Sequence, residues 1–261
     1  MSSLLTARGP VHYQVLGRGA PVLLIHGWLG SWDLWLPTMR ALAERNRCYA
    51  VDLYGFGESG KRQETARVDT YIDMVPVFLD ALGIERATVI GHSMGGTTAL
   101  GAAIRYPERV ARVGVIGSPI VGSSLALLLK LASVPWIGRL VRQNVGLLAL
   151  GMRLYAPLVT RAPGLWYPMV SRDIKRTTIE SFFASIRSLR HTDLRPRLTE
   201  VRMPALGVYG LRDVIVHPRQ HALMSAGIAH AQVKTLPGSG HFPMLDEPAM
   251  FDRLIRDFVT A

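Results

Sequence analysis

Apolar, β-branched runs that end in small or polar residues recur along the chain and alternate with segments of helical periodicity. The runs lie at 21–27, 47–53, 87–93, 112–118, 204–210 and 231–237, and the helical segments at 32–44, 70–83, 95–106, 219–227 and 248–259. Continuous apolar runs are typical of parallel strands buried on both faces. Because strand and helix alternate, the sequence predicts an α/β fold with right-handed crossovers and a mostly parallel, doubly wound sheet.

This alternation stops between residues 119 and 198, where no strand-like run bounded by turns occurs. The segments 123–145 and 173–189 are apolar on one side with basic residues interleaved, which is typical of a lid over a site or of a surface that faces a membrane. We therefore divide the chain into a core, residues 1–118 and 199–261, and a helical insertion, residues 119–198, that is not an independent domain. Its longest apolar run is interrupted by Lys130 and is too short to cross a bilayer.

The net charge of +11 is concentrated in the insertion, where residues 119–197 hold 12 Lys and Arg but 3 Asp and Glu. Such a surface favours an anionic substrate, an acidic carrier or an anionic membrane, although a solvated basic face over a helical core would show the same pattern. Few aromatic residues interleave with the basic ones, so we do not expect nucleic-acid binding. The N-terminal MSSLLTARGP has no apolar signal core, which favours a cytoplasmic protein.

Residues 89–96, VIGHSMGG, contain a G-x-S-x-G motif centred on Ser93, between a strand-like run and a helical segment. A serine on a tight strand-to-helix turn needs small neighbours, here Gly91 and Gly95, to keep its hydroxyl exposed on a strained backbone. The same turn places the N–H of Met94 at a helix N-terminus, where it can stabilise a developing oxyanion. The motif indicates a nucleophilic serine.

Residues 51–62, VDLYGFGESGKR, match two glycine-rich patterns of phosphate-binding loops. Such a loop binds phosphate only where a helix begins at once, and the second pattern also needs Ser or Thr after Lys61 to hold Mg²⁺. Arg62 and a polar run follow instead. We therefore predict that no nucleotide binds there.

In the order of these motifs, from about residue 10 to the end, the chain resembles serine hydrolases of the α/β-hydrolase family, esterases and lipases with a helical cap. HGWLGS (26–31) is similar to the family's oxyanion loop, which implies that Trp28 supplies a second oxyanion N–H. DLYGFGESG (52–60) is similar to the family's D-x-x-G-x-G-x-S segment, which implies that its glycines shape a turn near the site. Residues 119–198 occupy the position of the family's cap.

A serine hydroxyl is a weak nucleophile and requires a base, together with a group that orients the base. Asp213 directly follows the run 204–210, and His241 lies in the loop after the last run, so the order is Ser, Asp, His, as expected of this fold. The family's other acid position, at 117–119, reads GSP without a carboxylate. We therefore expect a catalytic triad of Ser93, Asp213 and His241.

The resemblance implies hydrolysis of carboxylic esters with apolar acyl or aromatic groups through an acyl-enzyme. Carbon–carbon bond hydrolysis is the first alternative, although those relatives carry Asn where this chain has His92. Thioesterase, acyltransferase and non-catalytic ligand-binding roles stay open, whereas a serine at position 93 argues against the family's enzymes with an aspartate nucleophile. We expect His26 and His92 to pack and hydrogen-bond, and Asp52 to fix a loop. Because the other histidines lack ligand spacing, we expect no metal and no cofactor.

Overall fold

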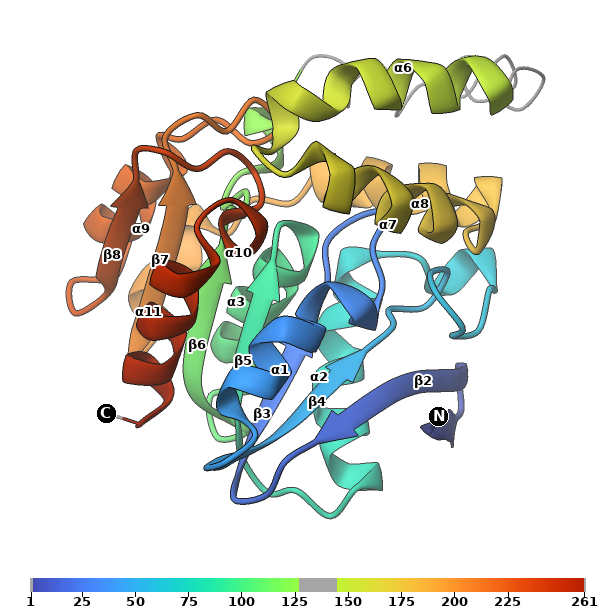
Figure 1. Cartoon of the computed structure of the whole chain (residues 1–261). Helices are drawn as coiled ribbons and strands as arrows, with labels where there is room; N and C mark the ends of the chain where they lie inside the picture. Colours follow the sequence, from blue (N-terminus) through green and yellow to red (C-terminus); the bar gives the residue numbers. More distant parts are fainter. Residues whose placement is uncertain (1, 127–144, 261) are drawn as a thin grey trace.

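The computed structural model describes residues 2–126 and 145–260, with the backbone alone for 145–149. Within these ranges the core is an eight-stranded sheet of order β1-β2-β4-β3-β5-β6-β7-β8 (Figure 1). The strands are β1 (Ser2–Thr6), β2 (Gly9–Leu16), β3 (Ala20–Ile25), β4 (Asn46–Val51), β5 (Ala87–His92), β6 (Val110–Ile116), β7 (Ala205–Gly210) and β8 (Gln232–Leu236). β3 to β8 pair in parallel, whereas β2 is antiparallel to both β1 and β4.

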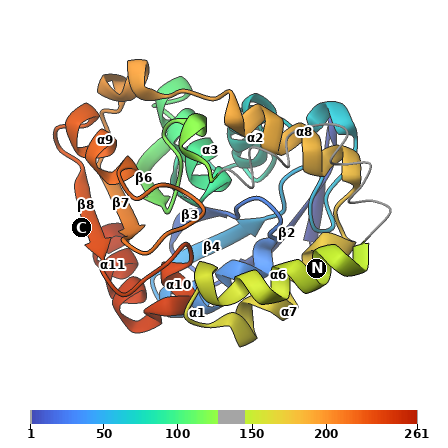
Figure 2. The same cartoon turned by 90° about the horizontal axis from the view of Figure 1, so that it is seen from above.

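Helices cover both faces of the sheet, as a doubly wound architecture requires. They are α1 (Leu36–Leu42), α2 (Val68–Ala81), α3 (Met94–Arg105), α9 (Gln220–Gly227), α10 (Pro243–Asp246) and α11 (Pro248–Thr260). Figure 2 shows α2, α3 and α9 on one side of the sheet and α1 and α11 on the other. The α/β fold and its mostly parallel sheet, predicted from strand–helix alternation, are thereby confirmed.

In the described part of the insertion, three α-helices follow β6 and precede β7, namely α6 (Val145–Val159), α7 (Pro163–Lys175) and α8 (Ile179–Arg190). They lie above the carboxyl ends of the parallel strands (Figure 1). Most of the predicted helical segment 123–145 falls outside the described residues. No helix in the described ranges has both the length and the apolar character needed to cross a bilayer.

Some local features differ from simple sequence patterns. The hairpin β1–β2 was not predicted, because neither strand forms a continuous apolar run: β1 alternates between partly buried and exposed residues, and β2 has two buried residues between partly buried and exposed ones. Pro76 lies within α2, eight residues after the helix begins, so it does not mark the start of that helix. Cys48 is fully buried on β4, and this burial raises the pKa of its thiol to about 12.

Candidate active site

Ser93 lies at the turn from β5 into α3 and has a left-handed backbone with φ of +52°. This conformation is strained for a residue with a side chain, and the Ser93 N–H is held by the carbonyl of Ile116 at 2.8 Å. A Cβ at Gly91 would collide with the Gly95 carbonyl, and one at Gly95 would collide with the carbonyls of Ile25 and His26. The glycines that flank the serine are therefore required by close backbone packing.

Asp213 and His241 form a buried pair from the loops after β7 and β8. His241 Nδ1 lies 2.7 Å from Asp213 Oδ2. The other carboxylate oxygen of Asp213 accepts hydrogen bonds from the N–H groups of Ile215 and Val216, at 2.8 and 2.9 Å. Because the carboxylate is fixed by backbone donors, it orients the imidazole ring with Nε2 on the opposite side.

Ser93 and His241 both line one cavity of about 360 Å³ between the core and the insertion. Among the described residues, no hydrogen bond joins the Ser93 hydroxyl to the imidazole. Such contacts are often long in the absence of substrate. The structure thus joins two of the three predicted residues directly and brings the third to the same cavity.

Two free backbone donors lie in the segments beside Ser93. The N–H groups of Trp28 and Met94 donate to no other residue in the described part of the chain. Trp28 lines the cavity, and Met94 is the first residue of α3. A Cβ built on Gly27 would lie 2.9 Å from the Ser93 Cβ, so the 26–31 loop packs directly against the serine. This arrangement can offer two N–H groups to a negatively charged oxygen.

His26 holds the peptide unit that carries the Trp28 N–H. The N–H of Leu53 donates to His26 Nε2 at 3.0 Å, so Nδ1 carries the proton and donates to the Gly27 carbonyl at 2.6 Å. Burial lowers the pKa of His26 and keeps the ring neutral. The ring thereby restrains the orientation of the Gly27–Trp28 peptide.

His92, directly before Ser93, packs against the loop that carries His241. Its Nε2 donates to the backbone carbonyl of His241 at 2.8 Å, and its ring packs 4.7 Å from the His241 ring and 4.6 Å from that of Phe242. Its Nδ1 is buried and has no hydrogen-bond partner in the described ranges. Burial, reinforced by the neighbouring His241, lowers the pKa of His92 well below its usual value.

The glycine-rich segment 52–60 forms a turn around Asp52. The two carboxylate oxygens of Asp52 accept hydrogen bonds from the N–H groups of Trp32 and Glu58, at 2.7 and 2.9 Å. A Cβ at Gly57, where φ is +51°, would collide with this carboxylate. These glycines therefore serve loop packing, and no helix begins directly after them to bind phosphate.

Asp246 connects the loop that carries His241 to the residues at the end of α6. Its Oδ1 accepts from the Thr160 hydroxyl at 2.5 Å and from the Arg161 N–H at 2.6 Å, while its Oδ2 accepts from the Gly240 N–H at 2.7 Å. In addition, the N–H of His241 donates to the Val159 carbonyl at 2.9 Å. Sequence reasoning missed this contact, because nothing in the linear pattern shows that residues 159–161 lie beside residues 240–246.

A second set of contacts connects the insertion to the 26–31 loop. The Ser31 hydroxyl lies 3.1 Å from both carboxylate oxygens of the fully buried Asp173 on α7. Burial raises the pKa of Asp173, and the neighbouring Arg172 opposes that rise. The Trp28 indole N–H donates to the Phe182 carbonyl on α8 at 3.2 Å. The insertion therefore contacts the loops on both sides of Ser93.

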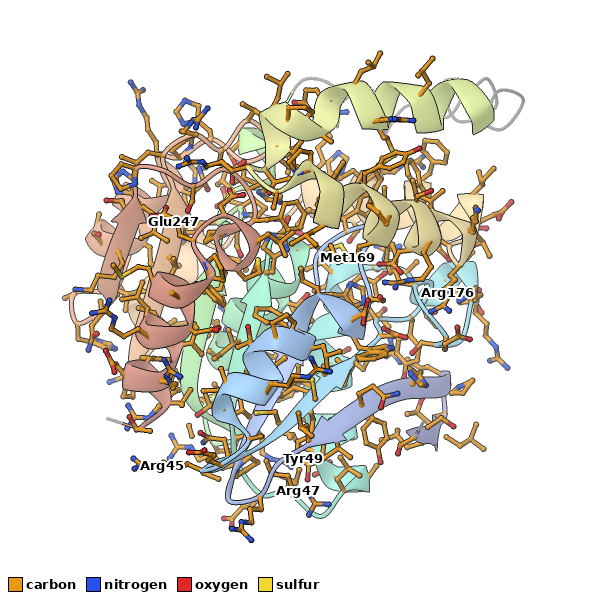
Figure 3. The ribbon with its side chains drawn as sticks, in the orientation of Figure 1. Arg45, Arg47, Tyr49, Met169, Arg176 and Glu247 are labelled. Carbon is orange, nitrogen blue, oxygen red and sulfur yellow. The ribbon has the colours of Figure 1, made fainter. Side chains whose placement is uncertain are left out.

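The cavity is lined almost entirely by apolar side chains. Those from the insertion include Met152, Tyr155, Trp166, Met169, Phe182 and Ile186. Figure 3 shows Met169 at the boundary between the insertion and the core. No Asp, Glu, Lys or Arg is found among the described lining residues. The described residues also contain no cluster of three His, Cys, Asp or Glu suited to a metal ion.

A 2-hydroxymuconate semialdehyde hydrolase of a Pseudomonas species (strain CF600) is 29% identical to the chain, with 94% of this chain and 88% of that protein covered. An enol-lactonase from Burkholderia xenovorans LB400 superposes with a TM-score of 0.87 at 22% identity and full coverage of both chains. A thermophilic esterase from Thermogutta terrifontis superposes with a TM-score of 0.85 at 23% identity, covering 99% and 97% of the two chains.

The sequence model of the alpha/beta hydrolase fold family matches residues 20–248 of the chain, a range that includes Ser93, Asp213 and His241. The matched interval contains β3 to β8, the strands that carry the site. The chain therefore belongs to the alpha/beta hydrolase fold family.

Proposed function

We propose that the protein is a serine hydrolase that cleaves carboxylic esters with apolar acyl or aromatic groups. The observation that carries this proposal is the 2.7 Å contact of Asp213 with His241, because His241 lines the same cavity as Ser93 on its strained turn. Ser93 Oγ attacks the ester carbonyl while His241 Nε2 takes its proton. Asp213 holds the Nδ1–H tautomer and stabilises the imidazolium that forms.

The alcohol leaves with the proton from His241, and an acyl-enzyme on Ser93 remains. His241 then activates a water molecule, which releases the acid and restores the serine. Each tetrahedral oxyanion is stabilised by the free N–H groups of Trp28 and Met94. Each donor of this kind contributes about 3 kcal/mol to lowering the barrier.

The cavity wall supports a neutral, apolar substrate. A buried carboxylate needs a cationic or polar partner, since an unpaired buried charge is strongly unfavourable. The relative from Pseudomonas is named for a muconate derivative, which carries a carboxylate. No described lining residue of this cavity offers a cation. This observation, together with His92 before the serine, favours ester hydrolysis over carbon–carbon bond hydrolysis.

Labelling with a fluorophosphonate probe tests the proposal. The wild-type protein should be labelled at Ser93, and Ser93→Ala should remove the label and lower kcat/KM for p-nitrophenyl butyrate by at least ~10³-fold. Ser123→Ala, at an exposed serine, is the matched control and should retain both. A folded wild-type protein that the probe does not label would contradict the proposal and favour a ligand-binding role.

A further inference from the structure

Helix α6 is apolar on two opposite sides. Met152, Tyr155 and Val159 point inward and line the cavity. Leu150, Leu154 and Leu158 are 53%, 72% and 59% exposed. Residues spaced by four share one face of a helix, so these leucines form a continuous exposed row, which we name the leucine stripe.

A surface helix normally turns polar residues toward water. Among the fifteen residues of α6, Arg153 is the single charged one. It is exposed and lies beside the leucine stripe in the helical repeat. Figure 1 shows α6 as the outermost element above the sheet, with its upper side facing away from the core. An apolar face in this position indicates a partner surface that excludes water.

The positive charge around the leucine stripe decides between two possible partners, a second copy of the chain and an anionic surface. Arg153 and Arg161 are both exposed, and neither forms an ion pair with another described residue. Residues 119–197 hold 12 Lys and Arg but 3 Asp and Glu. A second copy of the chain would bring a like-charged surface against this one. An anionic surface would instead be attracted to it.

We propose that the leucine stripe docks on an anionic phospholipid bilayer. The three leucines enter the boundary between headgroups and acyl chains, and Arg153 and Arg161 contact the lipid phosphates. Because the opposite side of α6 lines the cavity, the docked helix separates the bilayer from Ser93. The docking itself does not depend on the proposed hydrolase activity.

Co-flotation of the full chain with vesicles tests this proposal. Wild-type protein should float with vesicles of phosphatidylglycerol and phosphatidylcholine and should float much less with phosphatidylcholine alone. The variant with Leu150→Ser, Leu154→Ser and Leu158→Ser should bind the anionic vesicles at least tenfold more weakly. Leu5→Ser is the matched control, because Leu5 is 84% exposed on β1, away from α6, and it should leave binding unchanged.

The charge contribution has its own variants. Arg153→Gln and Arg161→Gln should each weaken binding to anionic vesicles by about fivefold, and added salt should reduce the difference. Arg45→Gln, at an exposed arginine on the opposite end of the molecule from α6 (Figure 3), should have little effect. Ser93→Ala should bind as the wild type does, which separates docking from catalysis.

Three results would overturn the proposal. In the first, the wild-type protein does not bind anionic vesicles. In the second, the variant with all three leucines changed to serine binds them as well as the wild type does. In the third, the wild-type protein self-associates in sedimentation experiments and the triple variant does not. The last result would assign the leucine stripe to a second copy. Thermal unfolding of each variant confirms that it is folded before binding is compared.

Discussion

His92 has one ring nitrogen paired and the other buried without a partner. Its Nε2–H donates to His241, so an added proton would have to sit on Nδ1, where no described acceptor is available. Burial and the neighbouring His241 lower the pKa of His92 well below its usual value. The folded protein therefore resists protonation at a pH where the unfolded chain, with a pKa near 6.5, takes up the proton.

Stability should consequently fall as the pH decreases through about 6.5, because the unfolded state then binds more protons than the folded state. Gln at position 92 keeps an N–H donor but does not titrate. His92→Gln should therefore reduce the loss of unfolding free energy by up to about 1.4 kcal/mol per pH unit below 6.5. Urea unfolding between pH 7.5 and 5.5 measures this difference.

Two comparisons complete that experiment. His26 also has a pKa lowered by burial, so part of the pH dependence should remain in the His92 variant. His191→Gln, at an exposed histidine, should leave the slope unchanged. Equal slopes in the wild type and His92→Gln would mean that His92 is not the group that resists protonation.

The candidate catalytic residues could be located from local sequence, whereas the residues that hold their loops in place could not. The pattern around Ser93, and the positions of Asp213 and His241 after strand-like runs, are visible in single segments. Their catalytic roles stay predictions. Asp173 and Asp246 act through residues more than 80 positions away, so local patterns carry no signal for them.

At the scale of elements, the end of α6 and the loop after β8 behave as one unit held by Asp246. Its two carboxylate oxygens accept three hydrogen bonds, whereas Asn would present an amide N–H to one of these donors. Asp246→Asn should lower the free energy of unfolding by about 1–3 kcal/mol. It should also lower kcat about tenfold or more, since a small displacement of His241 impairs proton transfer.

Urea unfolding and ester hydrolysis by the same preparations check both effects. Asp257→Asn on α11 is the matched control, because that carboxylate is exposed and makes no side-chain hydrogen bond among the described residues. An Asp246→Asn protein with unchanged kcat would show that the position of His241 does not depend on this contact.

The parallel strands β3 to β8 correspond to the six runs predicted from sequence. β3 to β7 are mostly buried, as expected of strands covered on both faces, whereas β8 is an edge strand with mostly exposed residues. β2 pairs at an edge of that set and is partly exposed, so its composition does not distinguish it from a loop. The element α10, four residues long, lacks the length for a helical period. Buried central strands were therefore predictable from their apolar runs, whereas the β1–β2 hairpin and the short α10 were not.

At the scale of the whole molecule, the cavity is formed between two parts of the chain. If the substrate's acyl group occupies it, each added methylene is buried and contributes about 0.8 kcal/mol. For a series of p-nitrophenyl esters, kcat/KM should therefore rise about fourfold per methylene until the cavity is filled. An ester with a terminal carboxylate on its acyl chain should react at least ~100-fold more slowly than its neutral counterpart.

Initial rates across that series measure both effects at fixed pH and salt. A preference for the carboxylate ester, or rates that do not vary with chain length, would contradict an apolar acyl site.

The sequence could indicate an apolar insertion over the sheet. The lining of the cavity depends on how α6, α7 and α8 pack, which the local periodicity does not determine.

The contact between Val159 and His241 has a consequence for how this chain could be re-engineered. A foreign insertion grafted between β6 and β7 would remove the carbonyl that holds the backbone of His241, the proposed general base, as well as two donors to Asp246. Lid exchange would therefore have to transplant the last turn of α6 together with the β8–α11 connection, as a matched pair. The segments to exchange are therefore defined by these contacts in the folded structure and not by the ends of the insertion in the sequence.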